Sequence, residues 1–337
     1  MRVWEIKERF GLDALALVER PEPEPGPGQV VVRVRAASLN YRDLLTVEGE
    51  YNPKQPLPLV PLSDGAGEVA AVGPGVTRVK AGDRVAGNFF QAWISGALSR
   101  ERLRTSLGGP LDGMAAERIV LDAEGVVTIP AHLSFEEAAC LPCAAVTAWN
   151  ALVAQGNLAV GETVLVLGTG GVALFALQLA RLLGARVIVT SSSDAKLERA
   201  TALGATDVVN SRTTPEWDKA VKTITDGQGV DNVLELGGAG TLARSLRAVR
   251  FGGQVSLIGN LSGLDAQLNL AHVFMRGVRL QGILVGNRDM FEAMNRVIAL
   301  HEMRPVIDRT FDFVDLPVAL EHLKSQGHFG KIVLRVA

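Results

Sequence analysis

A glycine-rich turn between an apolar strand and an apolar helix constrains this chain more than any other feature. Residues 163–167, TVLVL, are apolar and β-branched enough for a strand buried on both faces, and the apolar run from Val172 is long enough for a helix. Within GTGGVA, Gly168, Gly170 and Ala173 take the first, third and sixth positions of the pattern G-x-G-x-x-G/A. This context predicts that backbone N–H groups at the helix N-terminus bind the pyrophosphate of a dinucleotide.

After this turn, strands and helices alternate along the chain, which predicts a doubly wound parallel sheet of the α/β class. The expected elements are the strand ARVIVT, a helix from Asp194 as N-cap through Leu203, the strand DVVN, a helix over 217–225, the strand VDNVLEL, a helix over 242–249 and the strand GGQVSLIG. Right-handed crossovers bring the strand ends to one edge, at Gly168, Thr190, Asn210, Glu235 and Gly259. The nucleotide is expected at that edge.

The end of the second strand of this sheet favours NADP over NAD. An NAD-binding fold usually offers a carboxylate there to the ribose 2′-OH, whereas this chain has serines. The first carboxylate, Asp194, is expected to cap the next helix. Ser191 and Ser192 are expected to donate to a 2′-phosphate, with Lys196 and Arg212 as candidate cations. The alternative is that both cations are solvated surface charges, so NADP(H) is preferred and NAD(H) remains possible.

Further contacts to the nucleotide are expected from the whole glycine turn and from two later positions. The predicted nucleotide contacts, apart from the serines and cations above, are Gly168, Thr169, Gly170, Gly171, Val172, Gly259 and Lys331. Lys331 begins the apolar segment KIVLRV, which predicts a closing strand.

The rest of the chain is predicted to form a mainly β domain. The expected elements are a pair of strands within 1–20, a half-buried strand over 29–37, an irregular loop over 38–69, strands of a small barrel or rolled sheet over 64–87, a long excursion over 88–116, a helix starting near Ser134, and helices near 289–301 and 316–326. Because the C-terminal segment can return to this domain, we predict one domain from 1–144 with 285–337 and a dinucleotide-binding domain over 145–284.

Composition excludes several other classes of protein. With 47% hydrophobic and 21% charged residues, the chain is globular and not disordered. The net charge is −2 and no basic patch stands out, so we expect no nucleic-acid or membrane partner. The start MRVWEIKERFG lacks the apolar core of a signal peptide, and no run approaches a membrane span, so a cytoplasmic location is expected.

The only two cysteines, Cys140 and Cys143, form the motif CLPC. Their spacing would suit half of a metal site or a redox pair. A zinc cage needs about four ligands, and the five histidines are scattered along the chain. We therefore predict that both cysteines are buried packing residues.

The chain resembles the medium-chain dehydrogenase/reductase superfamily over nearly its whole length. The motifs that carry the resemblance are PGPGQVVVRVRAASLNYRD, DGAGEVAAVGPGVTRVKAGDRVAG, AWNAL, VLVLGTGGVA, GVDNVLELGG, GGQVSLIG and HFGKIVLRV. The resemblance implies a GroES-like substrate domain split around a Rossmann domain, with the active site in the cleft between them. It also implies hydride transfer with NAD(P)H and a homo-oligomer, for which we expect a homodimer.

This sequence departs from the zinc-binding members of that superfamily. The alcohol dehydrogenases hold a catalytic zinc with Cys, His and Cys, but here Asn40 stands at the first position and Ser63 at the second, and only Cys143 keeps a thiol. The excursion over 88–116 has no cysteine for a structural zinc. One thiol with Asn and Ser is not a usual zinc ligand set, so the chain looks like the zinc-independent, quinone-oxidoreductase-like branch, with no metal.

Without a Lewis acid, reduction of an activated C=C bond is the chemistry that this branch favours. Such a reduction needs hydride delivery, a donor for the substrate oxygen and a proton source. By resemblance, Asn40 and Asp43 lie at the cleft floor and Tyr41 or Tyr51 donates to the substrate oxygen. Arg42 either orients a carbonyl or pairs with Asp43. For Asn40 and Asp43, the alternative is a structural turn bonded to its own backbone.

We therefore predict an NADPH-dependent, zinc-independent reductase of quinones or α,β-unsaturated carbonyl compounds. One alternative is an NAD(P)-dependent alcohol dehydrogenase. Another is an NADPH-binding sensor or structural protein with little turnover.

Overall fold

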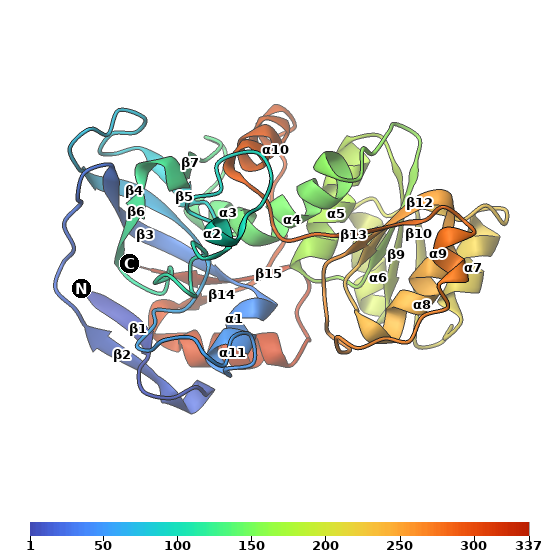
Figure 1. Cartoon of the computed structure of the whole chain (residues 1–337), viewed down its shortest axis with the longest axis horizontal. Helices are drawn as coiled ribbons and strands as arrows, with labels where there is room; N and C mark the ends of the chain where they lie inside the picture. The colour runs from blue at the N-terminus through green and yellow to red at the C-terminus, as the bar shows by residue number, and fades with distance from the viewer. Residues whose placement is uncertain (337) are drawn as a thin grey trace. The chain divides into compact units, whose positions relative to one another are not determined.

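The computed structural model describes residues 1–336, which form two compact units (Figure 1). The first, called here the β-rich unit, combines Met1–Val146 with the C-terminal segment that starts at Val285. The second, called the parallel-sheet unit, is Thr147–Leu284. The short helix α4, Val146–Trp149, carries the chain from one to the other. No helix in the described residues is long and apolar enough to cross a membrane.

A seven-stranded sheet forms the centre of the β-rich unit. Its strand order is β14-β15-β3-β4-β5-β7, with β6 also paired to β3, while β1 and β2 form a separate antiparallel pair. The strands are β1 Arg2–Ile6, β2 Leu15–Glu19, β3 Gln29–Leu39, β4 Asp64–Val72, β5 Arg84–Gly87, β6 Arg118–Asp122, β7 Val126–Thr128, β14 Ile307–Asp312 and β15 Lys331–Arg335. The closing strand β15 pairs antiparallel with β3, so the C-terminal segment lies in this unit.

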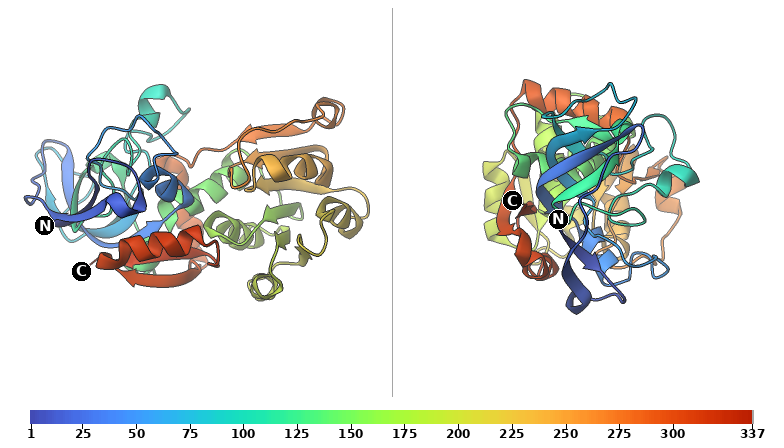
Figure 2. Two further views of the ribbon diagram at one scale, coloured as in Figure 1. Left: turned by 90° about the horizontal axis from the view of Figure 1, so that it is seen from below. Right: turned by 90° about the vertical axis from the view of Figure 1, so that its left-hand side faces the viewer.

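The helices of the β-rich unit lie beside this sheet. They are α1 Tyr41–Val47, α2 Arg100–Leu103, α3 Phe135–Ala139, α10 Arg288–Leu300 and α11 Leu316–Lys324. Figure 2 shows α11 running alongside β14 and β15. The helix expected near Ser134 is present as α3, where the Ser134 hydroxyl accepts from the backbone N–H of Glu137.

Helix α1 contradicts the prediction of an irregular loop over 38–69. The segment is rich in Pro, Gly and Asn overall, but its prolines, its glycines and Asn52 all follow the helix, and only Asn40 precedes it. Asn40 is the N-cap with an extended backbone, and the Asp43 carboxylate accepts from the Asn40 backbone N–H at 2.8 Å. The glycine that ends the helical region, Gly49, has φ of +79°. The local capping signal therefore prevails over the average composition.

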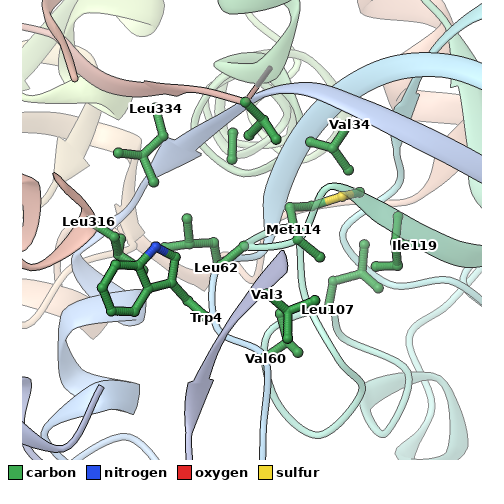
Figure 3. Close-up of a cluster of buried hydrophobic side chains, with 14 of the residues drawn as sticks. Val3, Trp4, Val34, Val60, Leu62, Leu107, Met114, Ile119, Leu316 and Leu334 are labelled. Atoms are coloured by element: carbon green, nitrogen blue, oxygen red, sulfur yellow. The ribbon is translucent and has the colours of Figure 1, made fainter. Parts of the chain in front are cut away.

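The core of the β-rich unit joins the ends of the chain to its middle (Figure 3). Trp4 from β1, Leu316 from α11 and Leu334 from β15 are buried in one cluster with Leu62 and Met114. The Trp4 indole N–H donates to a backbone carbonyl oxygen of the C-terminal segment at 2.8 Å. Burial of each such leucine stabilises the fold by about 2 kcal/mol, so the C-terminal segment is fixed to the sheet that carries the site.

The parallel-sheet unit contains a six-stranded sheet in which every pairing is parallel. Its order is β10-β9-β8-β11-β12-β13, which confirms the predicted doubly wound fold. The strands are β8 Thr163–Leu167, β9 Arg186–Ser191, β10 Asp207–Asn210, β11 Val230–Glu235, β12 Val249–Leu257 and β13 Arg279–Gly282. Chain order reverses between β8 and β11, and ligands of such sheets bind outside the strand ends at that point.

Five helices accompany this sheet: α5 Gly171–Leu182, α6 Asp194–Ala202, α7 Trp217–Ile224, α8 Ala239–Ala248 and α9 Ala271–Phe274. Side chains of α7 and α8 share one core cluster with the sheet, and right-handed crossovers put α5 and α6 on the other face. Helix α8 starts three residues before the predicted position, because Gly238 with φ of +87° turns the chain into it.

The prediction that Asp194 caps α6 is wrong. Ser193 is the N-cap, and its hydroxyl accepts from the backbone N–H of Lys196 at 3.4 Å. Asp194 is the first helical residue, and its carboxylate accepts from the Asn210 side-chain amide at 2.6 Å. Serine caps a helix as well as aspartate does, and the aspartate then serves to join α6 to the end of β10.

Candidate active site

The glycine turn of the parallel-sheet unit has the geometry of a phosphate-binding turn. Gly168 follows β8 with φ of +82°, and Gly170 is the N-cap of α5. A Cβ on Gly168 would meet no atom within 4 Å, so the space beside the turn is open. At Gly259, by contrast, a Cβ would lie 2.2 Å from the carbonyl oxygen of Leu236. Gly168 thus serves the backbone conformation, and Gly259 serves the close approach of two strand ends.

The predicted 2′-phosphate contacts lie at the carboxyl ends of β9 and β10. Ser191 is paired in register with Asn210, and its hydroxyl oxygen accepts from the backbone N–H of Ser193 at 3.3 Å. This leaves the hydroxyl proton of Ser191 for an acceptor. Ser192 and Arg212 are exposed. The structure therefore brings the serines to the same edge as Arg212.

Glu235, at the end of β11, is a residue whose role the sequence analysis missed. It is fully buried, and one carboxylate oxygen accepts from the backbone N–H groups of Gly237 at 2.8 Å and Gly238 at 3.0 Å and from the Thr241 hydroxyl at 2.5 Å. The other oxygen accepts from the Ser245 hydroxyl. This carboxylate fixes the loop after β11, beside the point where chain order reverses. A carboxylate that ends a buried strand directly before two glycines was the available signal.

In the β-rich unit, a set of polar side chains, called here the polar cluster, gathers where β3, β4 and β15 meet the start of α1. Its members are Asn40, Asp43, Ser63, Asp64, Cys143 and Lys331. The Lys331 ammonium donates to the carbonyl oxygen of Leu39 and to Oδ1 of Asn40, at 2.6 Å each. The Asn40 Nδ2 group donates to Oγ of Ser63 at 3.3 Å. The structure thus places Lys331, a predicted nucleotide contact, against the predicted catalytic Asn40.

Asp64 forms the buried end of this cluster. Its Oδ1 accepts from the Ser63 hydroxyl at 2.8 Å and its Oδ2 from the Cys143 backbone N–H at 3.0 Å. Burial raises the pKa of Asp64 to about 6; the Lys331 ammonium opposes this shift, and the Asp43 carboxylate adds to it. The sequence analysis did not select Asp64, because a carboxylate that starts a strand gives no signal of its own.

In the structure Arg42 pairs with Asp43. Its guanidinium is therefore engaged within the protein and is not available to orient a substrate carbonyl. The guanidinium contacts Asp43 at 3.1 Å and donates to the carbonyl oxygen of Gly108 at 2.9 Å. It also lies over the Tyr51 ring, 4.8 Å from the centroid. Pairing with Asp43, one of the two predicted roles of Arg42, is confirmed. The backbone bond from Asn40 to Asp43 likewise bears out a structural contribution of Asp43.

The two predicted tyrosines come from one end of α1 and from the segment after it. Tyr41 is the first residue of α1 and is half-buried. Tyr51 is 47% exposed and rests on Arg42. A phenol on a fixed cation is held in place and stays accessible, which suits a donor to a substrate oxygen.

The polar cluster does not fit a zinc ion. Zinc in proteins is held by thiolate, imidazole or carboxylate groups, but the cluster contains no histidine, and its one thiol is that of the half-buried Cys143. The Asn40 oxygen already accepts from the Lys331 ammonium, and both Asp64 oxygens accept hydrogen bonds. The prediction of two buried packing cysteines is confirmed for Cys140, which is buried, and is wrong for Cys143, which is only half-buried and belongs to the polar cluster. Throughout residues 1–336, no three His, Cys, Asp or Glu side chains form a group that could hold a metal.

Comparison with known protein families matches both parts of the chain. A family model described as a zinc-binding dehydrogenase matches residues 171–299, and one described as an alcohol dehydrogenase GroES-like domain matches residues 26–131. The first match does not include Asn40, Ser63 or Cys143, the positions where a catalytic zinc was considered.

Curated relatives cover nearly the whole chain. A zinc-type alcohol dehydrogenase-like protein of Schizosaccharomyces pombe is 44% identical over 313 residues, which cover 91% of this chain and 90% of that protein. An acryloyl-coenzyme A reductase of Metallosphaera sedula is 30% identical over 313 residues, covering 90% of this chain and 91% of that protein.

Solved structures have the same fold. An NAD-dependent alcohol dehydrogenase superposes with a TM-score of 0.91 at 36% identity, with 100% of each chain covered. A crotonyl-CoA carboxylase/reductase in complex with NADP gives a TM-score of 0.87 at 26% identity, covering 99% of this chain and 96% of that one. The predicted combination of a GroES-like domain with a Rossmann sheet is confirmed.

Proposed function

The chain belongs to the medium-chain dehydrogenase/reductase superfamily and is an NAD(P)-dependent oxidoreductase, and from this premise we propose that it reduces quinones or α,β-unsaturated carbonyl compounds with NADPH and without zinc. The observation that carries the proposal is the polar cluster, where Lys331 bonds to Asn40 at a position that a metal ligand would occupy by resemblance. A metal-free site lacks the Lewis acid that favours alcohol oxidation, whereas reduction of a conjugated C=C bond needs only hydride and hydrogen-bond donors.

NADPH, when bound, supplies the hydride that attacks the β-carbon of the substrate. Negative charge would then develop on the substrate oxygen, where a phenol from Tyr51 or Tyr41 would donate a hydrogen bond, and the resulting enolate or quinolate would take a proton from solvent. With an ordinary pKa near 10, a tyrosine is a donor at neutral pH. Asn40 and Asp43 form the floor on which the substrate oxygen is oriented.

NADPH is the proposed cofactor because the end of β9 carries serines and no carboxylate. Ser191, Ser192, Lys196 and Arg212 are proposed to bind the 2′-phosphate. The turn of residues 168–172 and the strand end at Gly259 are proposed to bind the pyrophosphate and the nicotinamide half. The related crotonyl-CoA carboxylase/reductase, which was solved with NADP, supports this choice, while the NAD-dependent relative makes NADH the competitor to test.

The competing function is alcohol oxidation, favoured by the names of the alcohol dehydrogenase relatives. The decisive experiment measures zinc in the purified protein by elemental analysis and then compares two assays, with and without a chelator. One follows NADPH oxidation with a quinone, an enone and an enoyl thioester, and the other follows NADP⁺ reduction with a panel of alcohols. We expect under one zinc ion per ten chains, and enone or quinone reduction that the chelator leaves unchanged.

Two other results would replace the proposal. Stoichiometric zinc with chelator-sensitive alcohol oxidation would make the protein an alcohol dehydrogenase. Tight NADPH binding with no turnover of any acceptor would make it a binding protein that acts as a sensor or structural partner.

A homodimer is proposed from the exposed edge of the parallel sheet. β13 is the last strand in the sheet order, and its Leu280 is 36% exposed. Nearby in the sequence, Phe274 and Met275 at the end of α9 are 72% and 71% exposed. An open strand edge and exposed large apolar side chains each favour pairing with a second copy. Sedimentation equilibrium should give twice the chain mass, and Leu280→Glu should give one chain mass.

We also propose a cytoplasmic location, which cell fractionation would test.

A further inference from the structure

The buried ammonium of Lys331 is the charge around which the polar cluster is arranged. Lys331 is only 3% exposed, and its Nζ bonds to two oxygen atoms at 2.6 Å. We propose that this ammonium is the resident cation of the active site, which fixes the Asn40 amide and balances the Asp64 carboxylate. Lys331 is then a positioning residue for turnover and not a ligand of the nucleotide phosphates. This inference rests on the proposed function.

The ammonium decides which way the Asn40 amide points. Nζ has only donors, so it faces the amide oxygen and leaves the amide nitrogen to donate to Ser63. The reversed amide would put an NH₂ group against an NH₃⁺ group and would lose both bonds. A cation on the amide oxygen also polarises the amide and strengthens its N–H donor. Asn40 is half-buried, so this oriented amide lies at the accessible margin of the cluster.

The charges leave Lys331 as the cation of Asp64. The cluster contains two carboxylates, Asp43 and Asp64, and both are fully buried. Arg42 is committed to Asp43 at 3.1 Å and to the carbonyl oxygens of residues 107–109. Without the Lys331 ammonium, the Asp64 carboxylate would be a buried charge with only hydrogen bonds to support it, which is costly.

The same contacts argue against the nucleotide role predicted from the sequence. Two of the three ammonium protons of Lys331 are used inside the β-rich unit, by Leu39 and Asn40. A phosphate contact would have to use the third proton alone or draw the ammonium away from Leu39 and Asn40. Loss of the ammonium is therefore expected to change turnover far more than nucleotide affinity.

The test compares Lys331→Met, which keeps the length of the side chain, with Lys331→Arg, which keeps the charge. Lys324→Met is the matched control, because Lys324 is an exposed lysine of the same unit, bonded to Glu48. For each variant we would measure the Kd of NADPH, kcat and KM with an enone, and the Tm from pH 5 to 8. Lys331→Met should lower kcat by about 10- to 100-fold, the size of a misplaced catalytic group. The Kd of NADPH should stay within about twofold, and Lys331→Arg should recover part of kcat.

Two double variants separate positioning from a merely structural role. If Lys331 acts through Asn40, adding Lys331→Met to Asn40→Ala should cost no further kcat, since both remove one interaction. If Lys331 balances Asp64, the Tm of Lys331→Met should fall more steeply with rising pH than that of the wild type, because the carboxylate ionises without a partner. Asp64→Asn in the same chain should remove that slope and restore folding where Lys331→Met alone folds poorly.

Three outcomes would overturn the inference. The first is a Kd of NADPH raised tenfold with kcat unchanged, which returns Lys331 to the nucleotide. The second is a lowered Tm with unchanged kcat, which makes Lys331 purely structural. The third is full additivity of Lys331→Met with Asn40→Ala. A wild-type protein that reduces no quinone or enone contradicts the proposed function instead, and the pH slope of Tm and its removal by Asp64→Asn still test the charge pairing.

Discussion

Replacement of Asp64 by Asn should change how the stability of the β-rich unit depends on pH. The pKa of Asp64 is raised from 3.8 to about 6, because burial disfavours the carboxylate more than Lys331 stabilises it. A raised pKa in the folded state means that the protonated acid stabilises the fold. This contribution is fully present below about pH 4 and is lost as pH rises through about 6. A pKa shift of about two units corresponds to about 3 kcal/mol in the free energy of unfolding.

We therefore expect the difference in the free energy of unfolding between wild type and Asp64→Asn to change by about 3 kcal/mol between pH 4 and 7. The substitution also replaces a carboxylate oxygen, which is an acceptor, by an NH₂ donor, and this shifts the free energy of unfolding by the same amount at every pH. Only the change of the difference with pH reports the ionisation of Asp64. The opening of the β-rich unit can be measured from the labelling of Cys140 with an activated disulfide that also reacts at acidic pH. Cys140 is fully buried in the β-rich unit, so its labelling requires this unit to open.

Asp308→Asn is the matched control for this experiment. His322 and the backbone N–H of Phe329 bond to Asp308, and although burial opposes them, the pKa of Asp308 is lowered. A group with a lowered pKa in the folded state stabilises the fold at pH values above its pKa in the unfolded chain, and this stabilisation is lost as pH falls. The free energy of unfolding therefore changes with pH in the opposite direction to that expected for Asp64. The assignment of Asp64 as a buried and destabilising carboxylate would be refuted if the stability difference for Asp64→Asn did not change with pH. It would also be refuted if that difference changed with pH in the same direction as the one for Asp308→Asn.

Three further sets of substitutions test the two units separately. Gly168→Ala and Gly161→Ala should each destabilise the fold by about 1 kcal/mol, since both have φ above +80° with open space at the Cβ, but only the former should weaken NADPH binding by calorimetry. Lys196→Ala should raise the Kd of NADPH more than that of NADH, and an equal effect on both would remove Lys196 from the 2′-phosphate. Arg42→Met should cost about 3–5 kcal/mol in urea unfolding, because Asp43 is left as an unpaired buried charge, and Arg42→Lys should cost less.

The parallel sheet was predictable because its strands are buried on both faces and read as short apolar runs between helices. TVLVL and ARVIVT match β8 and β9 almost residue for residue. Helix boundaries were less predictable where two residues compete for one role. Ser193 and Asp194 both suit an N-cap, and the choice depends on Asn210, which comes from the next strand. Such a contact is invisible in local sequence.

The polar cluster was predictable only in part, because its members come from four separate segments of the chain. Asn40 and Asp43 were selected from LNYRD, and Ser63 and Cys143 from comparison with a zinc ligand pattern. Nothing in the sequence joins Lys331 to Asn40, since 291 positions separate them and only the pairing of β15 with β3 brings them together.

Charge balance links the shape of the cluster to the chemistry proposed for it. Asp43 is compensated by Arg42 and Asp64 by Lys331, so the buried groups are neutral in sum before any substrate binds. A divalent ion added here would place excess positive charge beside two fixed cations, with the half-buried Cys143 thiol as its only soft ligand. A substrate whose oxygen gains negative charge during reduction meets the opposite situation, because fixed cations and polarised donors stabilise that charge without reorganisation. This charge balance is why we propose a developing oxyanion, and not a metal ion, as the group that the cluster stabilises.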